Sequence, residues 1–182
     1  MAGEGFRPLR VAMIGTGYVG LTTGVALAYV GHEVVGVDKD PGKLRLLQQG
    51  RSPIHEHGLQ ELLAQTRARL RFTDQAAPAV ADAEVIMIAV GTPPRTDGNA
   101  DTTMVEEAAR EVAEAMQDGR AYTVVVKSTV PIGTNRRVAN VIHRVLRDRG
   151  NAAKVLIASN PEFLREGQAL HNFLYPDRIV VG

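Results

Sequence analysis

The chain has 182 residues, of which 45% are hydrophobic, and its 21 Lys and Arg nearly balance its 20 Asp and Glu. This balance gives no net field for binding nucleic acid or an anionic membrane, so specificity is expected from local sites. The absence of cysteine excludes disulfides, thiolate metal sites and a cysteine nucleophile within these residues. Met1–Arg10 lacks an apolar core, and no run of about eighteen apolar residues occurs, so neither a signal peptide nor a membrane span is predicted and the expected compartment is the cytoplasm.

Apolar runs typical of buried parallel strands alternate along the chain with helical patterns. The runs are Leu9–Ile14, Val34–Val37, Val85–Val90, Thr123–Val126, Val155–Ala158 and Ile179–Val181, with a weaker candidate at Leu70–Thr73. The helical patterns are Leu21–Val30, Pro41–Gln49, Gly58–Ala68, a helix from the capping box Thr103-x-x-Glu106 to about Met116, and Gly133–Arg149. This alternation predicts an α/β fold with a doubly wound, Rossmann-like parallel sheet and helices on both faces. Because no linker or repeat interrupts it, residues 1–182 are predicted to form one domain.

The most informative stretch is Val11–Gly20, where a short apolar run leads through three spaced glycines into the first predicted helix. Gly15 and Gly17 would let the backbone turn tightly and approach a pyrophosphate, and Gly20 would let the helix pack against the strand. The alternative is that the glycines only close a strand-to-helix turn. The context favours a dinucleotide site, because a second apolar run ends in Asp38 about 20 residues later, where a ribose-binding acid is expected.

Asp38 also bears on the choice of cofactor. Its carboxylate would accept hydrogen bonds from an adenosine ribose and would repel a 2′-phosphate, which favours NAD over NADP. Lys39 and Lys43 complicate this preference, because a lysine can partly offset the repulsion. An alternative role for Asp38 is N-cap of the helix that begins near Pro41, and both roles can coexist.

Two polar segments follow later predicted strands, at the sheet edge where open α/β sheets bind ligands. In Val90-Gly-Thr-Pro-Pro94, Thr92 could touch the cofactor, although a rigid turn explains the segment equally well. Ser128 and Thr129 place two hydroxyls where they can orient a water or bond a nicotinamide ribose. Taken alone, these hydroxyls are better explained by helix capping or local turn bonds.

Two carboxylates follow the next strand of the predicted sheet. Glu162 offers a general base whose pKa burial could raise, and Glu166 offers a second acid for recognising hydroxyls. The alternative is a helix start with exposed acids, which the helix dipole favours. When Glu162 and Glu166 are considered together with the polar segments that follow the earlier strands, a functional role is the stronger interpretation.

Two other features are assigned no ligand. The arginines within Gly133–Arg149 are expected to form a solvated outer face rather than an anion site. His55 and His57 lack the further ligands that a closed metal site needs, so no metal site is predicted.

Five segments recur in a characteristic order along nearly the whole chain: Gly15-Thr-Gly-Tyr-Val-Gly20, Val90-Gly-Thr-Pro93, Lys127-Ser-Thr-Val-Pro131, Asn160-Pro-Glu-Phe-Leu-Arg-Glu166 and Tyr175-Pro-Asp-Arg-Ile-Val180. Together they resemble the nucleotide-sugar 6-dehydrogenase family, and the last two are most similar to members that act on UDP-glucose. The resemblance implies oxidation of a sugar CH₂OH to a carboxylate in two hydride transfers to two NAD⁺, giving UDP-glucuronate from UDP-glucose. Members that oxidise GDP-mannose or UDP-N-acetylmannosamine are the close alternative. A non-catalytic dinucleotide sensor is a further one, but it would have no use for Glu162 and Thr129.

The resemblance also implies roles for individual residues. It assigns Glu162 as the catalytic base and Thr129 as a residue that helps to hold the catalytic water. It implies a border with the sugar nucleotide at Glu162, Phe163, Leu164, Arg165 and Glu166. It implies NAD contacts at Gly15, Thr16, Gly17, Tyr18, Val19, Gly20, Asp38, Lys43, Val90, Gly91, Thr92, Pro93, Pro94, Ser128, Thr129 and Glu166.

Two departures from the family pattern qualify these expectations. Members of the family usually have proline where His57 stands, so a surface loop is expected to differ here. The family's nucleophilic cysteine, with its accompanying lysine, asparagine and aspartate, lies beyond a long central helix that these residues do not include. The chain is therefore expected to bind NAD without turning over a nucleotide sugar. Because family members commonly dimerise through that helix, the chain itself is expected to be monomeric or weakly associated.

Overall fold

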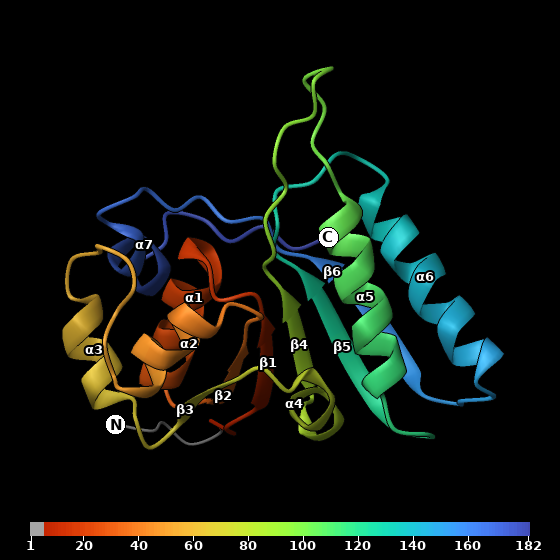
Figure 1. Cartoon of the computed structure of the whole chain (residues 1–182), viewed down its shortest axis with the longest axis horizontal. Helices are drawn as coiled ribbons and strands as arrows, with labels where there is room; N and C mark the ends of the chain where they lie inside the picture. Colours follow the sequence, from red (N-terminus) through yellow and green to blue (C-terminus); the bar gives the residue numbers. More distant parts are fainter. Residues whose placement is uncertain (1–5) are drawn as a thin grey trace.

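The computed structural model describes residues 6–182, and a sheet of six strands in the order β3-β2-β1-β4-β5-β6 forms its centre (Figure 1). All neighbouring strands run parallel. The strands are β1 (Arg10–Ile14), β2 (Glu33–Val37), β3 (Leu70–Thr73), β4 (Val85–Ile88), β5 (Ala121–Val126) and β6 (Lys154–Ser159). The predicted doubly wound α/β sheet is confirmed, and this strand order is the one found in dinucleotide-binding folds.

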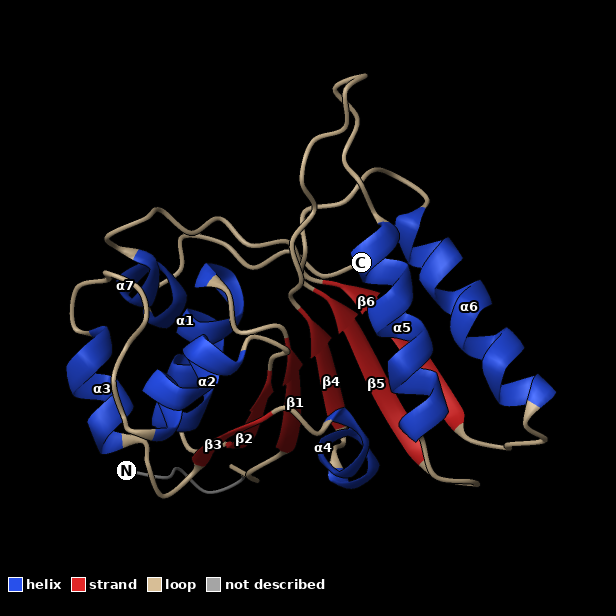
Figure 2. Cartoon of the chain, viewed as in Figure 1, coloured by secondary structure: helices blue, strands red, loops and turns tan. Residues whose placement is uncertain are grey.

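Helices cover both faces of the sheet (Figure 2). They are α1 (Tyr18–Tyr29), α2 (Pro41–Gln48), α3 (Leu59–Gln65), α4 (Ala76–Asp82), α5 (Thr103–Ala115), α6 (Thr134–Asp148) and α7 (Ala169–Leu174). Because successive side chains of a strand point to opposite faces, β1 contributes to two separate cores. Val11 and Met13 are buried with residues of α1, α2, α3 and α7, whereas Ala12 and Ile14 are buried with residues of α4, α5 and α6.

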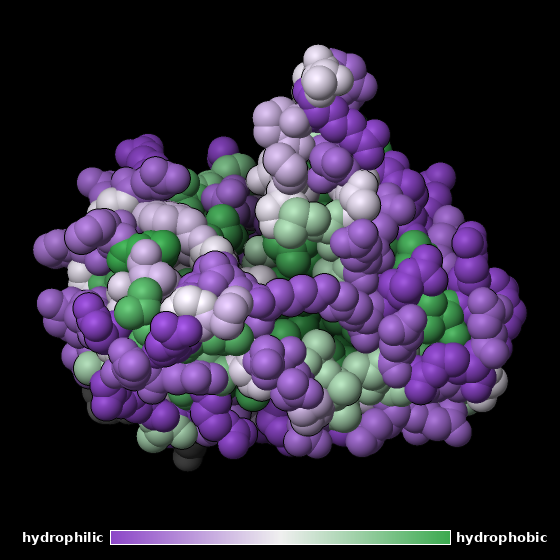
Figure 3. Space-filling model, in the orientation of Figure 1, coloured by the Kyte–Doolittle hydropathy of each residue, from purple (hydrophilic) through white to green (hydrophobic). Residues whose placement is uncertain are grey.

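The winding of the sheet reverses at β1. The chain passes from β1 through α1 to β2 on one side, and later through α4 to β4 on the other side of β1. In open α/β sheets, ligands bind in the crevice that such a reversal leaves beyond the carboxyl ends of the strands. Figure 3 shows a hollow with hydrophobic residues on its floor, between the half of the molecule that carries α1 and α2 and the half that carries α5.

The prediction of a strand at Ile179–Val181 is wrong. The segment is irregular, and Ile179 and Val181 expose 72% and 68% of their surface. Backbone pairing with β6 occurs instead at Gly182, which exchanges two hydrogen bonds with Ser159 at 2.7 and 3.0 Å. A single pair of bonded residues does not make a strand. The apolar composition of residues 179–181 therefore did not suffice to predict one, because these residues are not paired with β6 along their length.

The capping box predicted at Thr103 does not form, because the helix begins one residue earlier than predicted and the N-cap side chain bonds no backbone N–H of the first turn. Thr102 is the N-cap of α5, and its hydroxyl lies 3.2 Å from the Glu106 carboxylate. The N–H of Thr103 donates to the Asp101 carboxylate at 2.9 Å. In the predicted capping box this N–H would have donated to Glu106 instead.

Among residues 6–182, no helix is both long and apolar enough to cross a membrane. The signal-peptide prediction concerns Met1–Arg10, and residues 1–5 of that stretch lie outside the described residues. The single domain over residues 1–182 stays a prediction.

Candidate functional site

The three spaced glycines between β1 and α1 differ in why they must be glycine. Gly15 has a positive φ of 92°, and a Cβ there would lie 2.8 Å from the Ala89 carbonyl oxygen. A Cβ on Gly20 would lie 1.9 Å from the Gly15 carbonyl oxygen, so the helix could not pack as it does. Gly17, the N-cap of α1, has an ordinary φ of −67°, and a Cβ there would meet no atom within 4 Å.

The open space at Gly17 fits a bound anion. Gly17 precedes the first turn of α1, whose N–H groups have no partners within the helix and carry the positive end of its dipole. A Cβ would fill the space through which a pyrophosphate would have to reach those groups. The alternative, in which the glycines only close the turn, explains Gly15 and Gly20 but not Gly17.

Asp38 lies directly after β2 and joins this strand to the glycine loop. Its Oδ2 accepts the Thr16 N–H at 2.9 Å, the Thr16 hydroxyl at 2.7 Å and the Lys43 ammonium at 2.7 Å. Its Oδ1 accepts the Asp40 N–H at 3.0 Å, and this oxygen has room for a further donor such as a ribose hydroxyl. Asp40, not Asp38, is the side-chain N-cap of α2, so the alternative capping role for Asp38 is wrong.

The surroundings of Asp38 keep its carboxylate ionised. Burial alone would raise the pKa of Asp38, but the hydrogen bonds that it accepts, foremost from Lys43, lower the pKa to about 2. Of the two neighbouring lysines, Lys43 thus forms an ion pair with Asp38, whereas Lys39 forms an ion pair with Glu111 on α5. The negative charge that should repel a 2′-phosphate is present but partly balanced.

The free energy of unfolding is expected to depend on pH in acid because of the lowered pKa of Asp38. The pKa of Asp38 is about 2 in the folded chain and ordinarily 3.8, so its stabilisation is fully present above about pH 4 and is lost as the pH falls towards 2. The loss corresponds to about 2 kcal/mol. Urea unfolding of the wild type and of Asp38→Asn at several pH values should show their difference shrinking by this amount between pH 5 and pH 2. A constant difference over that range would contradict the assignment.

A cavity of about 260 Å³ opens beside the glycine loop. Several predicted cofactor residues line it: Gly15, Gly17, Asp38, Lys43, Val90 and Gly91. Apolar side chains from β1, β2, α4, α5 and the loop after β4 complete its walls: Ile14, Val37, Ala76, Ala89, Met104 and Ala108. An apolar slot with a carboxylate at its edge suits the adenosine half of a dinucleotide.

The remaining predicted cofactor residues do not line this cavity. Thr16 is buried behind the loop, Gly20 is buried in α1, and Val19 is half-buried beside it. The connection from β4 to α5, which contains Thr92, Pro93 and Pro94, projects above the sheet (Figure 1).

Hydrogen bonds join the loops that follow β4 and β5. The Ser128 hydroxyl donates to the Val90 carbonyl at 2.7 Å, and the Thr92 hydroxyl donates to the Thr129 carbonyl at 3.0 Å. The N-cap of α6 is Gly133, so neither Ser128 nor Thr129 caps that helix. The hydroxyl of Thr129 remains on an exposed residue at the sheet edge.

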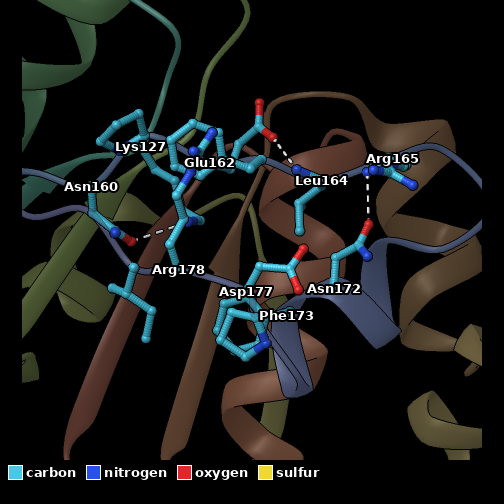
Figure 4. Close-up of a pocket in the computed structure, with 13 residues that line it drawn as sticks. Lys127, Asn160, Glu162, Leu164, Arg165, Asn172, Phe173, Asp177 and Arg178 are labelled. Atoms are coloured by element: carbon cyan, nitrogen blue, oxygen red, sulfur yellow. Dashed lines mark hydrogen bonds between the residues drawn. The ribbon is translucent and has the colours of Figure 1, made fainter.

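A second cavity, of about 400 Å³, lies beyond the end of β6 (Figure 4). It is lined by four of the predicted substrate residues, Glu162, Phe163, Leu164 and Arg165, together with Lys127 and Arg178 among others. The Glu162 carboxylate accepts the Leu164 N–H at 2.8 Å, which fixes the turn of this segment. Glu166 is exposed and lies outside the lining of this cavity.

The exits of β5 and β6 lie side by side. Val126 pairs with Ser159, and the Asn160 N–H donates to the Val126 carbonyl at 3.0 Å. Thr129 and Glu162 therefore leave neighbouring strands at the same edge of the sheet. Their catalytic roles stay predictions.

Lys127 is a candidate functional residue that the sequence reasoning did not single out. It is 4% exposed, its ammonium donates to Asn160 Oδ1 at 3.1 Å, and it lies 5.8 Å from the centre of the Phe173 ring. Burial lowers the pKa of Lys127, and the charge of Glu162 acts in the opposite direction. The signal for it was a lysine placed directly after the apolar strand β5.

The part of the chain from residue 6 onward contains no group of three or more His, Asp and Glu side chains placed to hold a metal ion. His55 and His57 are both exposed.

With this geometry in view, comparisons with known proteins identify the family. Residues 9–182 match the model of the UDP-glucose/GDP-mannose dehydrogenase family, NAD binding domain. The chain belongs to this family. The recognition made from the five segments is thus confirmed, and NAD is the cofactor of the family's domain.

Individual relatives of the family are similar over nearly all of the chain. UDP-glucose 6-dehydrogenase of Rhizobium meliloti is 52% identical over 178 residues, which cover 96% of this chain and 39% of that protein. The solved UDP-glucose dehydrogenase of Pyrobaculum islandicum is 43% identical with a TM-score of 0.90, covering 100% of this chain and 42% of that one. GDP-mannose dehydrogenase of Pseudomonas aeruginosa is 40% identical with a TM-score of 0.87, covering 96% and 41%. The chain thus spans about two fifths of the length of these relatives.

Proposed function

We propose that this chain is the cofactor-binding part of an enzyme that oxidises UDP-glucose to UDP-glucuronate with two NAD⁺. The observation that carries the proposal is the unobstructed N-terminus of α1 at Gly17, with the Asp38 carboxylate held beside it. The pyrophosphate would lie against the first N–H groups of α1, and a ribose hydroxyl would reach Asp38 Oδ1. UDP-glucose is favoured as substrate because the curated relatives named for it reach 52% identity.

The second cavity supplies side chains for the sugar. NAD, when bound, accepts a hydride from the sugar carbon. Glu162 acts as a base towards the substrate or the attacking water, and Thr129 helps to hold that water. Phe163, Leu164 and Arg165 border the sugar nucleotide, with the buried charge of Lys127 close to Glu162.

The same proposal limits what the chain does alone. Oxidation through a thioester needs a cysteine thiolate, and these 182 residues contain none. The chain is therefore proposed to bind NAD, to produce no NADH from UDP-glucose, and to be a monomer or a weak dimer.

GDP-mannose is the second candidate substrate. It is supported by the 40% identity and the TM-score of 0.87 to a GDP-mannose dehydrogenase. The base and the hexose would be read largely by residues outside this chain, so a panel of nucleotide sugars on an enzyme containing it distinguishes the candidates.

Calorimetric titration of the purified chain with NAD⁺ and with NADP⁺ tests the proposal. NAD⁺ should bind with one site per chain, and NADP⁺ should bind at least about tenfold more weakly because Asp38 faces the 2′ position. Absorbance at the NADH band should stay flat after addition of UDP-glucose and NAD⁺. Failure to bind NAD⁺ would refute the dinucleotide site, and NADH formation would refute the proposed dependence on a cysteine.

A further inference from the structure

Three segments that are far apart in the sequence meet at the hydroxyl of Tyr18. Tyr18 is the first residue of α1, and its hydroxyl donates to the carboxylate of Glu56, in the loop before α3. The N–H of Gly167, in the segment after β6, lies 2.8 Å from the Tyr18 hydroxyl oxygen and 2.8 Å from Glu56 Oε2. The other Glu56 oxygen lies 3.4 Å from the N–H of Leu170, in the first turn of α7.

This junction holds the far end of an irregular segment. Residues 160–168 form neither helix nor strand, and most of them from residue 163 onward are exposed. The start of this segment is held beside β5, because the Asn160 N–H donates to the Val126 carbonyl at 3.0 Å and the Lys127 ammonium donates to Asn160 Oδ1 at 3.1 Å. Farther along, the Arg165 N–H donates to Asn172 Oδ1 at 3.0 Å, within the same part of the chain. Gly167, by contrast, is tied to residues of α1 and of the loop before α3. Glu56 thus fixes the far end of the segment that contains Glu162 and Glu166 against the body of the domain.

Several hydrogen bonds to one carboxylate stabilise the junction. Burial and the hydrogen bond to Glu56 raise the pKa of Tyr18 to about 12, so the phenol remains a donor. Glu56 then accepts a hydroxyl and two backbone N–H groups, and bonds of this kind to an ionised acceptor are stronger than neutral ones. The far side of the junction is anchored in a core, because Leu170 is buried with residues of α1 and α3 and the adjacent Ala169 is also buried.

We propose that Glu56 is a positioning residue that, through Tyr18 and Gly167, joins the glycine loop to the segment carrying Glu162 and Glu166. The inference rests on the proposed function, because it gives Glu162 and Glu166 their roles there. Tyr18 follows Gly17 directly, so a dinucleotide that orders the start of α1 also orders the bonds to Glu56 and Gly167. Cofactor occupancy and the order of the sugar-facing segment are thereby linked.

Hydrogen exchange of the chain with and without NAD⁺ tests this linkage. In the wild type, NAD⁺ should slow exchange of amides 163–170 as well as those of the glycine loop. Glu56→Ala should speed exchange of the Gly167 amide by about tenfold or more and should abolish the effect of NAD⁺ on 163–170. The affinity of Glu56→Ala for NAD⁺ should fall by a smaller factor than the factor by which exchange of the Gly167 amide rises, because the proposed pyrophosphate and ribose contacts remain.

Two further variants complete the design. Glu61→Ala removes an exposed acid on the neighbouring helix α3 and should behave as the wild type. Glu56→Gln keeps an acceptor for Tyr18 and should lie between wild type and Glu56→Ala, which also gives a measurement if the alanine variant does not fold. Unchanged exchange at 163–170 in both Glu56 variants would overturn the proposal. If the wild type failed to bind NAD⁺, the proposed function would fail, yet the faster exchange without NAD⁺ would still report the positioning role.

Discussion

Replacing Gly17 by aspartate is expected to abolish NAD⁺ binding without weakening the fold. Position 17 is the N-cap of α1, where Asp and Ser are preferred residues, and a Cβ there meets no protein atom within 4 Å. The added carboxylate would occupy the space proposed for the pyrophosphate and would repel its charge. We expect a loss of affinity of about 100-fold or more, measured by calorimetric titration.

Gly17→Ser separates bulk from charge. Serine is an equally good N-cap but adds no charge, so its loss of affinity should be smaller than that of Gly17→Asp. Urea unfolding of both variants should give free energies equal to or above that of the wild type. Undiminished NAD⁺ binding by Gly17→Asp would place the cofactor elsewhere, whereas a large loss of stability would mean that Gly17 serves the turn.

Replacing Gly20 by alanine should have the opposite profile, with a large loss of stability. The new Cβ would lie 1.9 Å from the Gly15 carbonyl oxygen, a backbone atom that cannot move aside without shifting α1 away from β1. A cost of about 3 kcal/mol in the free energy of unfolding is expected from overpacking of this kind. Urea unfolding monitored by circular dichroism measures it.

Gly24→Ala provides the matched control for this substitution in the same helix. A Cβ on Gly24 would lie 3.6 Å from Val34 Cγ1, an ordinary contact, and alanine is the better helix former. This variant should be as stable as the wild type or more stable by about 0.5–1 kcal/mol. If both alanine variants lost stability equally, close packing of Gly20 against Gly15 would not be the cause.

The fold could be predicted largely because its signals are local. The alternation of apolar strands with helical patterns predicted a parallel sheet, and the glycines after β1 predicted where the first crossover helix begins. The order of the strands is not a local property, since it depends on which strand each crossover reaches. α7 was missed because its 6 residues span less than two turns, too short for a helical period to stand out. Ile179–Val181 resembled a strand in composition but does not pair as one.

The candidate site divides in the same way. Asp38 was recognisable from its spacing to the glycines, and its place beside the loop agrees with that pattern. The junction of Tyr18 with Glu56 and Gly167 left no pattern, because its partners lie 38 and 149 residues from Tyr18 along the chain. Lys127 carried a detectable anomaly, a charge at the end of a buried strand, but its partner Asn160 depends on the pairing of β5 with β6.

The double use of the Asp38 carboxylate has a consequence for redesigning the cofactor preference. The oxygen that receives Lys43 also holds the N–H and the hydroxyl of Thr16, so exchanging Asp38 for a neutral residue to admit a phosphate would also release the glycine loop. A variant engineered to accept NADP⁺ therefore needs a new acceptor for Thr16 together with the change at position 38. Under the proposed roles, the residue that would select the ribose and the loop that would hold the phosphates have to be altered as one unit.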